Sequence, residues 1–210
     1  MIVVNFKTYS QATGDKSEEL AHRCLEAAEA TGERVVVAPA IYDLHRIEGA
    51  ESFAQHIDPV EPGSHTGHVL AEGVKKAGAS GTILNHSENR MEKEDIQEAL
   101  ERAKENGLET ILCAKSPEEC EELSELGPDY IAFEPPELIG GETSVSDAKP
   151  GLIEEAVERS EVPVLTGAGI KEREDVEKSI ELGCEGVLVA SGVVKSENPE
   201  EVVKELCEGL

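Results

Sequence analysis

A carboxylate with the chemistry of an acid or base stands at the end of an apolar run, just before a stiff di-proline segment. The run 130–133 gives way at once to Glu134, which Pro135 and Pro136 follow. Proline fixes its own φ and restricts the residue before it, so Glu134 is held extended. The segment that continues to about Asp147 exceeds the roughly two to six residues of an ordinary connection after a strand, which favours a lid. The pattern therefore predicts a carboxylate held in place at the base of a loop that can close over a ligand.

Two further polar groups end other apolar runs. Asn5 and Lys7 stand two residues apart at the end of the run 2–6, and an extended chain projects both from one face. The ammonium of Lys7 is suited to hold an anion. His86 follows the run 81–84, where a neutral imidazole can donate a hydrogen bond to a carbonyl oxygen. A lone Lys or His is more often a solvated surface residue, so only the combination indicates a site.

Small residues follow the last two apolar runs. They form the segments 166–169, Thr-Gly-Ala-Gly, and 190–192, Ala-Ser-Gly. Exposed backbone N–H groups in such loops cradle phosphate groups, and the loops after the seventh and eighth strands of an α/β barrel commonly do so. One G-x-G is weak evidence because glycine also serves tight turns. Two such loops side by side predict a phosphate-binding site.

These polar residues lie close together in space only if the apolar runs before them are parallel strands. Runs rich in Val, Ile and Leu alternate with charged stretches of helical periodicity, which is typical of repeated βα units. We predict eight strands, the number that a closed (β/α)8 barrel requires, at Ile2–Phe6, Val35–Ala38, Ser52–Gln55, Gly81–Leu84, Glu109–Cys113, Tyr130–Phe133, Val162–Leu165 and Gly186–Val189. The third has the weakest pattern. In such a barrel the active site lies at the carboxyl ends of the strands.

Helix boundaries support the same count. The segment 116–119, Ser-Pro-Glu-Glu, is a capping box with proline in the first turn, and Asn198 before Pro199 marks another helix start. Gly107, Gly127 and Gly183 stand where helices end before predicted strands, as left-handed C-terminal residues do.

Length and composition agree with one α/β domain over residues 1–210. Apolar residues make up 39% and aromatic residues 3%, so the core is built from aliphatic side chains, as in buried parallel strands. No composition shift marks a linker.

The chain is strongly acidic, with 19 Lys and Arg against 45 Asp and Glu and a formal charge of −26. Like charge repels nucleic acid and anionic membranes, so we expect neither as a partner. The acidic residues lie between apolar positions on helix faces, which indicates a folded domain with an acidic coat. Salt screens the self-repulsion of such a coat, and our hypothesis is a salt-rich, halophilic cytoplasm.

The five cysteines, an odd number without a C-x-x-C pair, predict reduced thiols and neither a disulfide framework nor a metal site. No run approaches the roughly 18 apolar residues of a membrane span, and the start of the chain lacks a signal sequence, so we expect a cytoplasmic protein.

Five motifs occur in an order that resembles one enzyme family. They are Asn-Phe-Lys at 5–7, Asn-His-Ser-Glu at 85–88, Phe-Glu-Pro-Pro-Glu-Leu-Ile-Gly at 133–140, Gly-Ala-Gly at 167–169 and Ala-Ser-Gly at 190–192. Together with the segment 63–68, Gly-Ser-His-Thr-Gly-His, they make nearly the whole chain similar to triosephosphate isomerase, in the compact form found in archaea. The resemblance implies a single-domain TIM barrel that interconverts dihydroxyacetone phosphate and D-glyceraldehyde 3-phosphate, in glycolysis and gluconeogenesis, without cofactor or metal.

The resemblance also implies residue roles. Glu134 is then the base and His86 the neutral electrophile, with Glu88 as the acidic neighbour of the histidine. Lys7 supplies positive charge to the developing oxyanion and to the phosphodianion. The implied substrate- and phosphate-binding set comprises Asn5, Phe6, Lys7, Ile139, Gly169, Ala190 and Ser191.

Two further expectations come from the resemblance. Gly141-Glu142 follows Ile139-Gly140 where the family often has a small or hydroxyl residue, so Glu142 must point away from a bound dianion. The segment 63–68 is expected to reach into a neighbouring subunit, which implies a homodimer or a homotetramer. The negative charge of each chain predicts that the oligomeric state depends on ionic strength.

Two alternatives stay open from the residues alone. Another phosphate-binding barrel, such as a phosphoribosyl isomerase or an indole-glycerol-phosphate synthase, shares the two glycine loops in outline but does not require His86 beside Glu134. A binding module that kept the fold and lost catalysis is the other, since fold alone does not imply function.

Overall fold

A closed parallel barrel is the centre of the molecule. The computed structural model describes residues 1–135 and 150–210. Its strands pair in sequence order, and β8 returns to pair with β1. The strands are β1 (Ile2–Asn5), β2 (Val35–Ala38), β3 (Glu51–Ala54), β4 (Gly81–Leu84), β5 (Glu109–Ala114), β6 (Tyr130–Phe133), β7 (Val164–Thr166) and β8 (Gly186–Val189). The predicted (β/α)8 fold is therefore confirmed.

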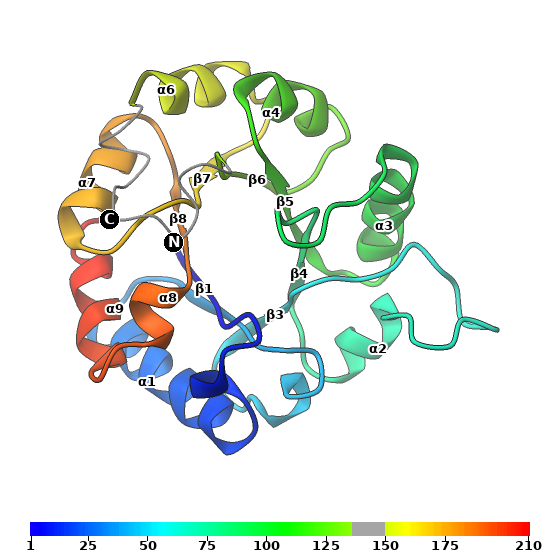
Figure 1. Cartoon of the computed structure of the whole chain (residues 1–210), viewed down its shortest axis with the longest axis horizontal. Helices are drawn as coiled ribbons and strands as arrows, with labels where there is room; N and C mark the ends of the chain where they lie inside the picture. Colours follow the sequence, from blue (N-terminus) through cyan, green and yellow to red (C-terminus); the bar gives the residue numbers. More distant parts are fainter. Residues whose placement is uncertain (136–149) are drawn as a thin grey trace.

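Helices surround the barrel as a ring (Figure 1). Within the described ranges the α-helices are α1 (Asp15–Thr31), α2 (Ala71–Lys76), α3 (Lys93–Glu105), α4 (Pro117–Ser124), α6 (Pro150–Arg159), α7 (Arg173–Glu181), α8 (Ser191–Val194) and α9 (Pro199–Cys207). Two short 3-10 helices, η1 (Ser10–Ala12) and η2 (Leu44–Arg46), follow β1 and β2. None of the described helices is long and apolar enough to cross a membrane.

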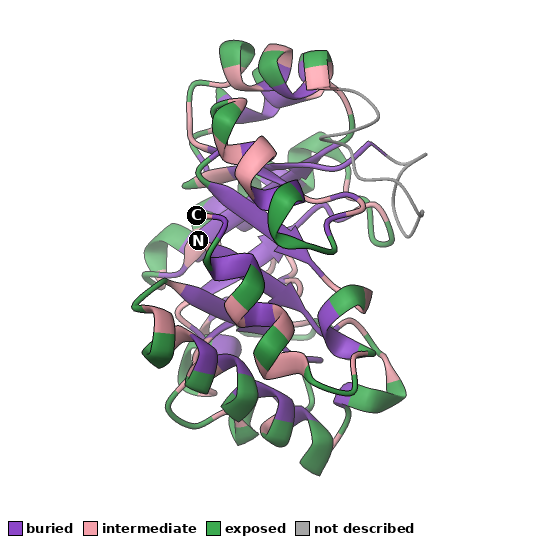
Figure 2. Ribbon diagram, turned by 90° about the vertical axis from the view of Figure 1, so that its left-hand side faces the viewer, coloured by how far each residue is buried: buried purple, intermediate pink, exposed green. Residues whose placement is uncertain are grey.

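The core has an inner and an outer layer, because successive strand side chains point to opposite faces of the sheet. In β1, Val3 points into the barrel, where it packs with Ile83, Ile111 and Leu165. Its neighbours in β1 pack outward in the layer between the strands and α1, α7 and α9. Figure 2 shows buried strands at the centre and exposed outer faces on the helices. The aliphatic character of both layers is what the composition predicts.

The predicted strands agree with the observed ones to within two residues. Four have the predicted bounds, and the weakest, β3, is present one residue earlier. The largest difference is at β7, which begins at Val164 and not at Val162. Pro163 lies just before it and has no N–H to donate to a neighbouring strand.

The predicted helix boundaries are also observed. Ser116 caps α4 by accepting a hydrogen bond from the Glu119 backbone N–H at 3.2 Å. Gly107, Gly127 and Gly183 have φ of 61°, 73° and 96°, which side chains other than glycine rarely adopt. Short turns of this kind return the chain to the amino end of the barrel, so every strand runs toward the same mouth.

Candidate active site

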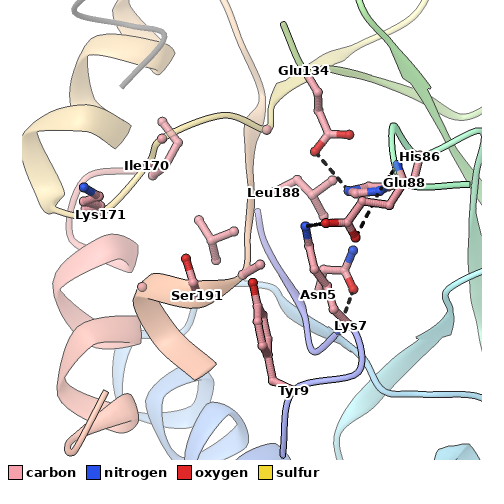
Figure 3. Close-up of a pocket in the computed structure, with 15 residues that line it drawn as sticks. Asn5, Lys7, Tyr9, His86, Glu88, Glu134, Ile170, Lys171, Leu188 and Ser191 are labelled. Carbon is pink, nitrogen blue, oxygen red and sulfur yellow. Dashed lines mark hydrogen bonds and ion pairs between the residues drawn. The ribbon is translucent and has the colours of Figure 1, made fainter. Parts of the chain in front are cut away.

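A cavity of about 170 Å³ opens at the carboxyl ends of the strands. At roughly 30 Å³ per water molecule it has room for a small ligand. Seven of the residues predicted from the sequence line it: Asn5, Lys7, His86, Glu134, Gly169, Ala190 and Ser191. They come from separate parts of the chain that the barrel brings together. In Figure 3 the charged groups around His86 lie on one side of the cavity and the loops after β7 and β8 on the other.

Glu134 lies at the end of β6 and is 4% exposed. Its backbone N–H donates to the carbonyl of Ala114 at 2.8 Å, which continues the sheet pairing by one residue beyond the strand. The carboxylate points toward His86, and Oε1 lies 3.5 Å from Nε2 of the imidazole (Figure 3). Among the described residues the other oxygen, Oε2, has no hydrogen-bond partner. A buried carboxylate oxygen in this position can accept a proton from a ligand.

The contacts of His86 indicate which ring nitrogen carries the proton. The backbone N–H of Glu88 donates to Nδ1 at 3.2 Å. Since Nδ1 accepts this hydrogen bond, the imidazole is neutral and carries its proton on Nε2, which faces Glu134 and the cavity. A neutral Nε2–H at this point can donate to a carbonyl or enediolate oxygen of a ligand.

The local backbone holds His86 at the rim. Asn85 has φ of 58°, a left-handed conformation that asparagine tolerates better than most residues. Its side chain donates to the carbonyl of Cys113 at 2.9 Å and accepts from the backbone N–H of Met91 at 3.0 Å. These two bonds join β4 to β5 and to the start of the next helix. The turn that carries the imidazole is therefore fixed from both sides.

Lys7 lies across the cavity from the glycine loops. Its φ of 47° turns the chain away from β1, and its backbone N–H donates to Asn5 Oδ1 at 3.0 Å. The ammonium lies 2.7 Å from Oε1 of Glu88. Gln55 donates to the Lys7 carbonyl at 3.0 Å and so ties this turn to the end of β3. The cation beside His86 is thus positioned by backbone and side-chain contacts.

Comparison with known proteins agrees with this geometry. The family model described as triosephosphate isomerase matches residues 1–207. The triosephosphate isomerase of Methanocaldococcus jannaschii is 45% identical over 194 residues, which cover 89% of this chain and 89% of that protein. That of Methanothermus fervidus is 44% identical over 194 residues, covering 89% of this chain and 87% of that protein. The chain belongs to the triosephosphate isomerase family.

The fold of this chain is also similar to that of a solved structure. The triosephosphate isomerase of Bartonella henselae has a TM-score of 0.73 and 20% sequence identity, with 99% of this chain and 97% of that chain covered. As a member of the triosephosphate isomerase family, the chain is an isomerase. The resemblance drawn from the sequence motifs is confirmed, and the family match favours it over the other phosphate-binding barrels.

Three residues of the predicted site need separate mention. Phe6 does not line the cavity: it is fully buried in the layer between the strands and the helices, because it alternates with Asn5 and Lys7. Its side chain therefore cannot contact a ligand, which corrects the expectation for this residue. Ile139 and Glu142, with the predicted lid, lie outside the described residues.

Three contacts of Glu134 and Lys7 were not predicted from the sequence, although Gly167 belongs to the predicted phosphate-binding loop 166–169. Gly167 leaves space for the carboxylate, since a Cβ added there would lie 2.5 Å from Glu134 Cγ and 2.8 Å from Oε1. Cys113 is fully buried beside Glu134, and burial together with that carboxylate raises the pKa of its thiol well above the usual value. Gln55 follows the weakest predicted strand. The rule that found Glu134, a polar residue just after an apolar run, also points to Gln55.

The described residues contain no group of three or more His, Cys, Asp or Glu side chains arranged to hold a metal ion.

Proposed function

We propose that this cavity interconverts dihydroxyacetone phosphate and D-glyceraldehyde 3-phosphate, with Glu134 as the base. The supporting observation is the buried carboxylate at 3.5 Å from a neutral imidazole, with Oε2 unpartnered among the described residues. In the forward direction Glu134 takes a proton from C1 of the ketose while the carbonyl π electrons move to O2. Glu134 then returns the proton to C2, after the hydroxyl proton of O1 has been transferred to O2. The atoms of substrate and product are the same, so the step needs no oxidant or reductant.

His86 and Lys7 stabilise the charge that develops on oxygen. The Nε2–H of the imidazole donates to the enediolate, and the ammonium supplies positive charge beside it. Both groups are oriented before a ligand binds, through the Glu88 backbone N–H and the Asn5 side chain. Preorganised donors cost no rearrangement when the charge appears.

The phosphate lies on the opposite side of the cavity in this proposal. Gly169, Ala190 and Ser191 line that side, and Gly169 has φ of 73°, a conformation that residues other than glycine rarely adopt. Ile139 is a further contact that the family resemblance implies. Binding of the phosphate at this end places C1 and C2 of the triose between Glu134 and His86.

Replacement of the base tests the proposal. Glu134→Gln keeps the size of the side chain and removes its basicity, so kcat should fall by about 10³-fold or more in both directions. Glu98→Gln on the exposed face of α3 is the matched control and should keep full activity. Turnover in D₂O should place deuterium at C2 of the aldose, because a carboxylic acid exchanges its proton with solvent. An E134Q enzyme with more than a tenth of the original kcat would contradict the assignment, and phosphate binding without any turnover in the unaltered protein would favour a binding module.

We also propose that the whole chain acts as one domain within a homodimer or homotetramer. The loop 63–68 is exposed and lies in the segment that projects beside α2 (Figure 1). Ile41 and Tyr42, the exposed large apolar residues of the described chain, follow the neighbouring strand β2 at the same end of the barrel. A partner subunit that covers both loops would bury them.

A salt-rich cytoplasm is the setting we propose for these subunits. The charge of −26 per chain opposes association at low ionic strength, and salt screens it within about 10 Å at 0.1 M. Light scattering should therefore give a larger mass in multimolar KCl than in dilute buffer, together with a higher Tm. A single mass and a flat Tm across that range would count against both the oligomer and the halophilic setting.

A further inference from the structure

The turn that carries Lys7 adjoins two cavities. Lys7 lines the cavity of about 170 Å³ at the mouth of the barrel. It also lines a second cavity of about 170 Å³, which Gln55 and His56 after β3 help to form. A segment that borders open space has fewer packing contacts than one in the core. Hydrogen bonds therefore contribute more than packing does to holding this turn.

The backbone conformation of Lys7 requires such a restraint. Its φ of 47° lies in the left-handed region, which is unfavourable for a residue with a Cβ atom. Residues in this conformation persist only where the surrounding structure fixes them. The side chain of Asn5 accepts the Lys7 backbone N–H at 3.0 Å, but Asn5 precedes the same turn. The carbonyl side of Lys7 needs an anchor on a different strand.

The side chain of Gln55 provides this anchor. Its Nε2 donates to the carbonyl of Lys7 at 3.0 Å and to the carbonyl of Ala38 at 2.8 Å. The Ala38 carbonyl is itself fixed, because it also accepts the Phe6 backbone N–H at 3.0 Å and so continues the pairing of β1 with β2. Both acceptors are carbonyl oxygens, so the amide nitrogen and not the amide oxygen faces them. Gln55 thus joins the strained turn to a rigid point of the barrel.

We propose that Gln55 is a positioning residue for the isomerisation and that it acts through Lys7. By holding the Lys7 carbonyl, its amide keeps the turn left-handed and the ammonium beside the oxygen on which charge develops. The inference rests on the proposed function for the role of Lys7. Gln55 is not among the described residues that line the catalytic cavity, so its effect on the reaction passes through the turn. A catalytic group displaced by about 1 Å can lower a rate by about 10²-fold.

Steady-state kinetics of a variant without the amide test this role. Gln55→Met keeps a side chain of similar size and removes both donated hydrogen bonds. We expect kcat to fall by about 30-fold, less than the full effect because the flexible lysine stem partly compensates. KM should stay within about threefold, since the charge that Lys7 stabilises develops in the transition state. Gln97→Met on the exposed face of α3 is the matched control and should keep full activity.

A double-mutant cycle separates positioning from general destabilisation. Lys7→Met removes the ammonium, so in that background Gln55→Met should change kcat by no more than about twofold. A 30-fold loss of kcat in both backgrounds, or an unchanged kcat in Q55M alone, would overturn the proposal. If thermal unfolding shows that Q55M is not folded, Gln55→Glu enters the same cycle, because its ionised carboxylate has the same shape and no N–H to donate.

Hydrogen exchange of the Lys7 backbone amide, followed by NMR, tests the anchor without relying on activity. Q55M should speed this exchange by about tenfold, because the turn opens more often, and Q97M should leave it unchanged. If the unaltered protein did not isomerise triose phosphates and Q55M still sped the exchange, the isomerase assignment would fail and the anchoring of the turn by Gln55 would stand. Exchange at the original rate in Q55M would overturn the anchoring itself.

Discussion

Gly167 limits where the proposed base can lie, and an alanine there tests how closely the active site depends on that position. The added Cβ would lie 2.5 Å from Glu134 Cγ, whereas ordinary carbon contacts begin at about 3.5 Å. The nearest atom is in the middle of the glutamate side chain, so rotation of the carboxylate tip does not relieve the overlap. The Glu134 backbone is paired to Ala114 at 2.8 Å and cannot easily withdraw. The carboxylate must shift by roughly 1 Å, which can cost about 10²-fold in rate.

Steady-state kinetics measure this effect. In Gly167→Ala we expect kcat to fall by about 10²-fold, while the inhibition constant of inorganic phosphate changes little because the phosphate end of the cavity is intact. Gly73→Ala is the control: it adds the same methyl group on an exposed position of α2, where the nearest atom is 3.7 Å away, and should leave kcat unchanged. If G167A is folded by circular dichroism and keeps kcat within threefold, the geometric reasoning is refuted.

Three further predictions concern stability and thiol chemistry. Arg34 hydrogen-bonds Glu51 at the amino end of the barrel and lowers its pKa below the usual 4.5, and both side chains are about one-third exposed. Arg34→Met should therefore lower the free energy of unfolding by about 1–2 kcal/mol near pH 7. Chemical denaturation should show the difference from the unaltered protein shrinking as the pH falls through the lowered pKa of Glu51, because protonation ends the ion pair; a difference that grows in acid would contradict this. All five cysteines are free and buried, and burial raises the pKa of Cys24, Cys120 and Cys184 to about 12. A thiol reagent at pH 8 should label none of them within minutes unless denaturant is added, and mass spectrometry would detect any native labelling. Gly81→Ala would place a Cβ 2.5 Å from a backbone carbonyl and from the Phe53 ring, so Tm should drop by several degrees, corresponding to about 2–3 kcal/mol, and an unchanged Tm would show that the barrel interior can expand.

The sequence predicts those parts of the site that follow from strand direction. Asn5, Lys7, His86 and Glu134 each lie at the end of an apolar run, and parallel strands in a closed barrel bring such ends to one mouth. The same logic needs only the order of polar and apolar residues. It therefore holds although the exact strand bounds differ by a residue or two.

Features that depend on distances across the barrel were beyond sequence reasoning. The space that Gly167 leaves for Glu134 depends on the register of β6 and β7, in which Phe133 pairs with Thr166. Glycine is common in loops because it adopts backbone conformations that side chains disfavour, so its residue type alone does not point to the base. Phe6 illustrates the opposite case: the motif suggested a ligand contact, and the two-residue period of the strand directs its ring into the outer core.

The seam of the barrel has a consequence for how the chain is made. Ile2, Val3 and Val4 of β1 pair with residues 187–189 of β8. The pairing of β1 is therefore complete only after β8, the last strand of the barrel, has been synthesised. Until β8 has emerged, β1 and the most recently made strand are both unpaired edges, which readily join other chains. Closing a loop of nearly the whole chain also slows folding. A nascent chain therefore remains vulnerable to aggregation until β8 has emerged and has paired with β1.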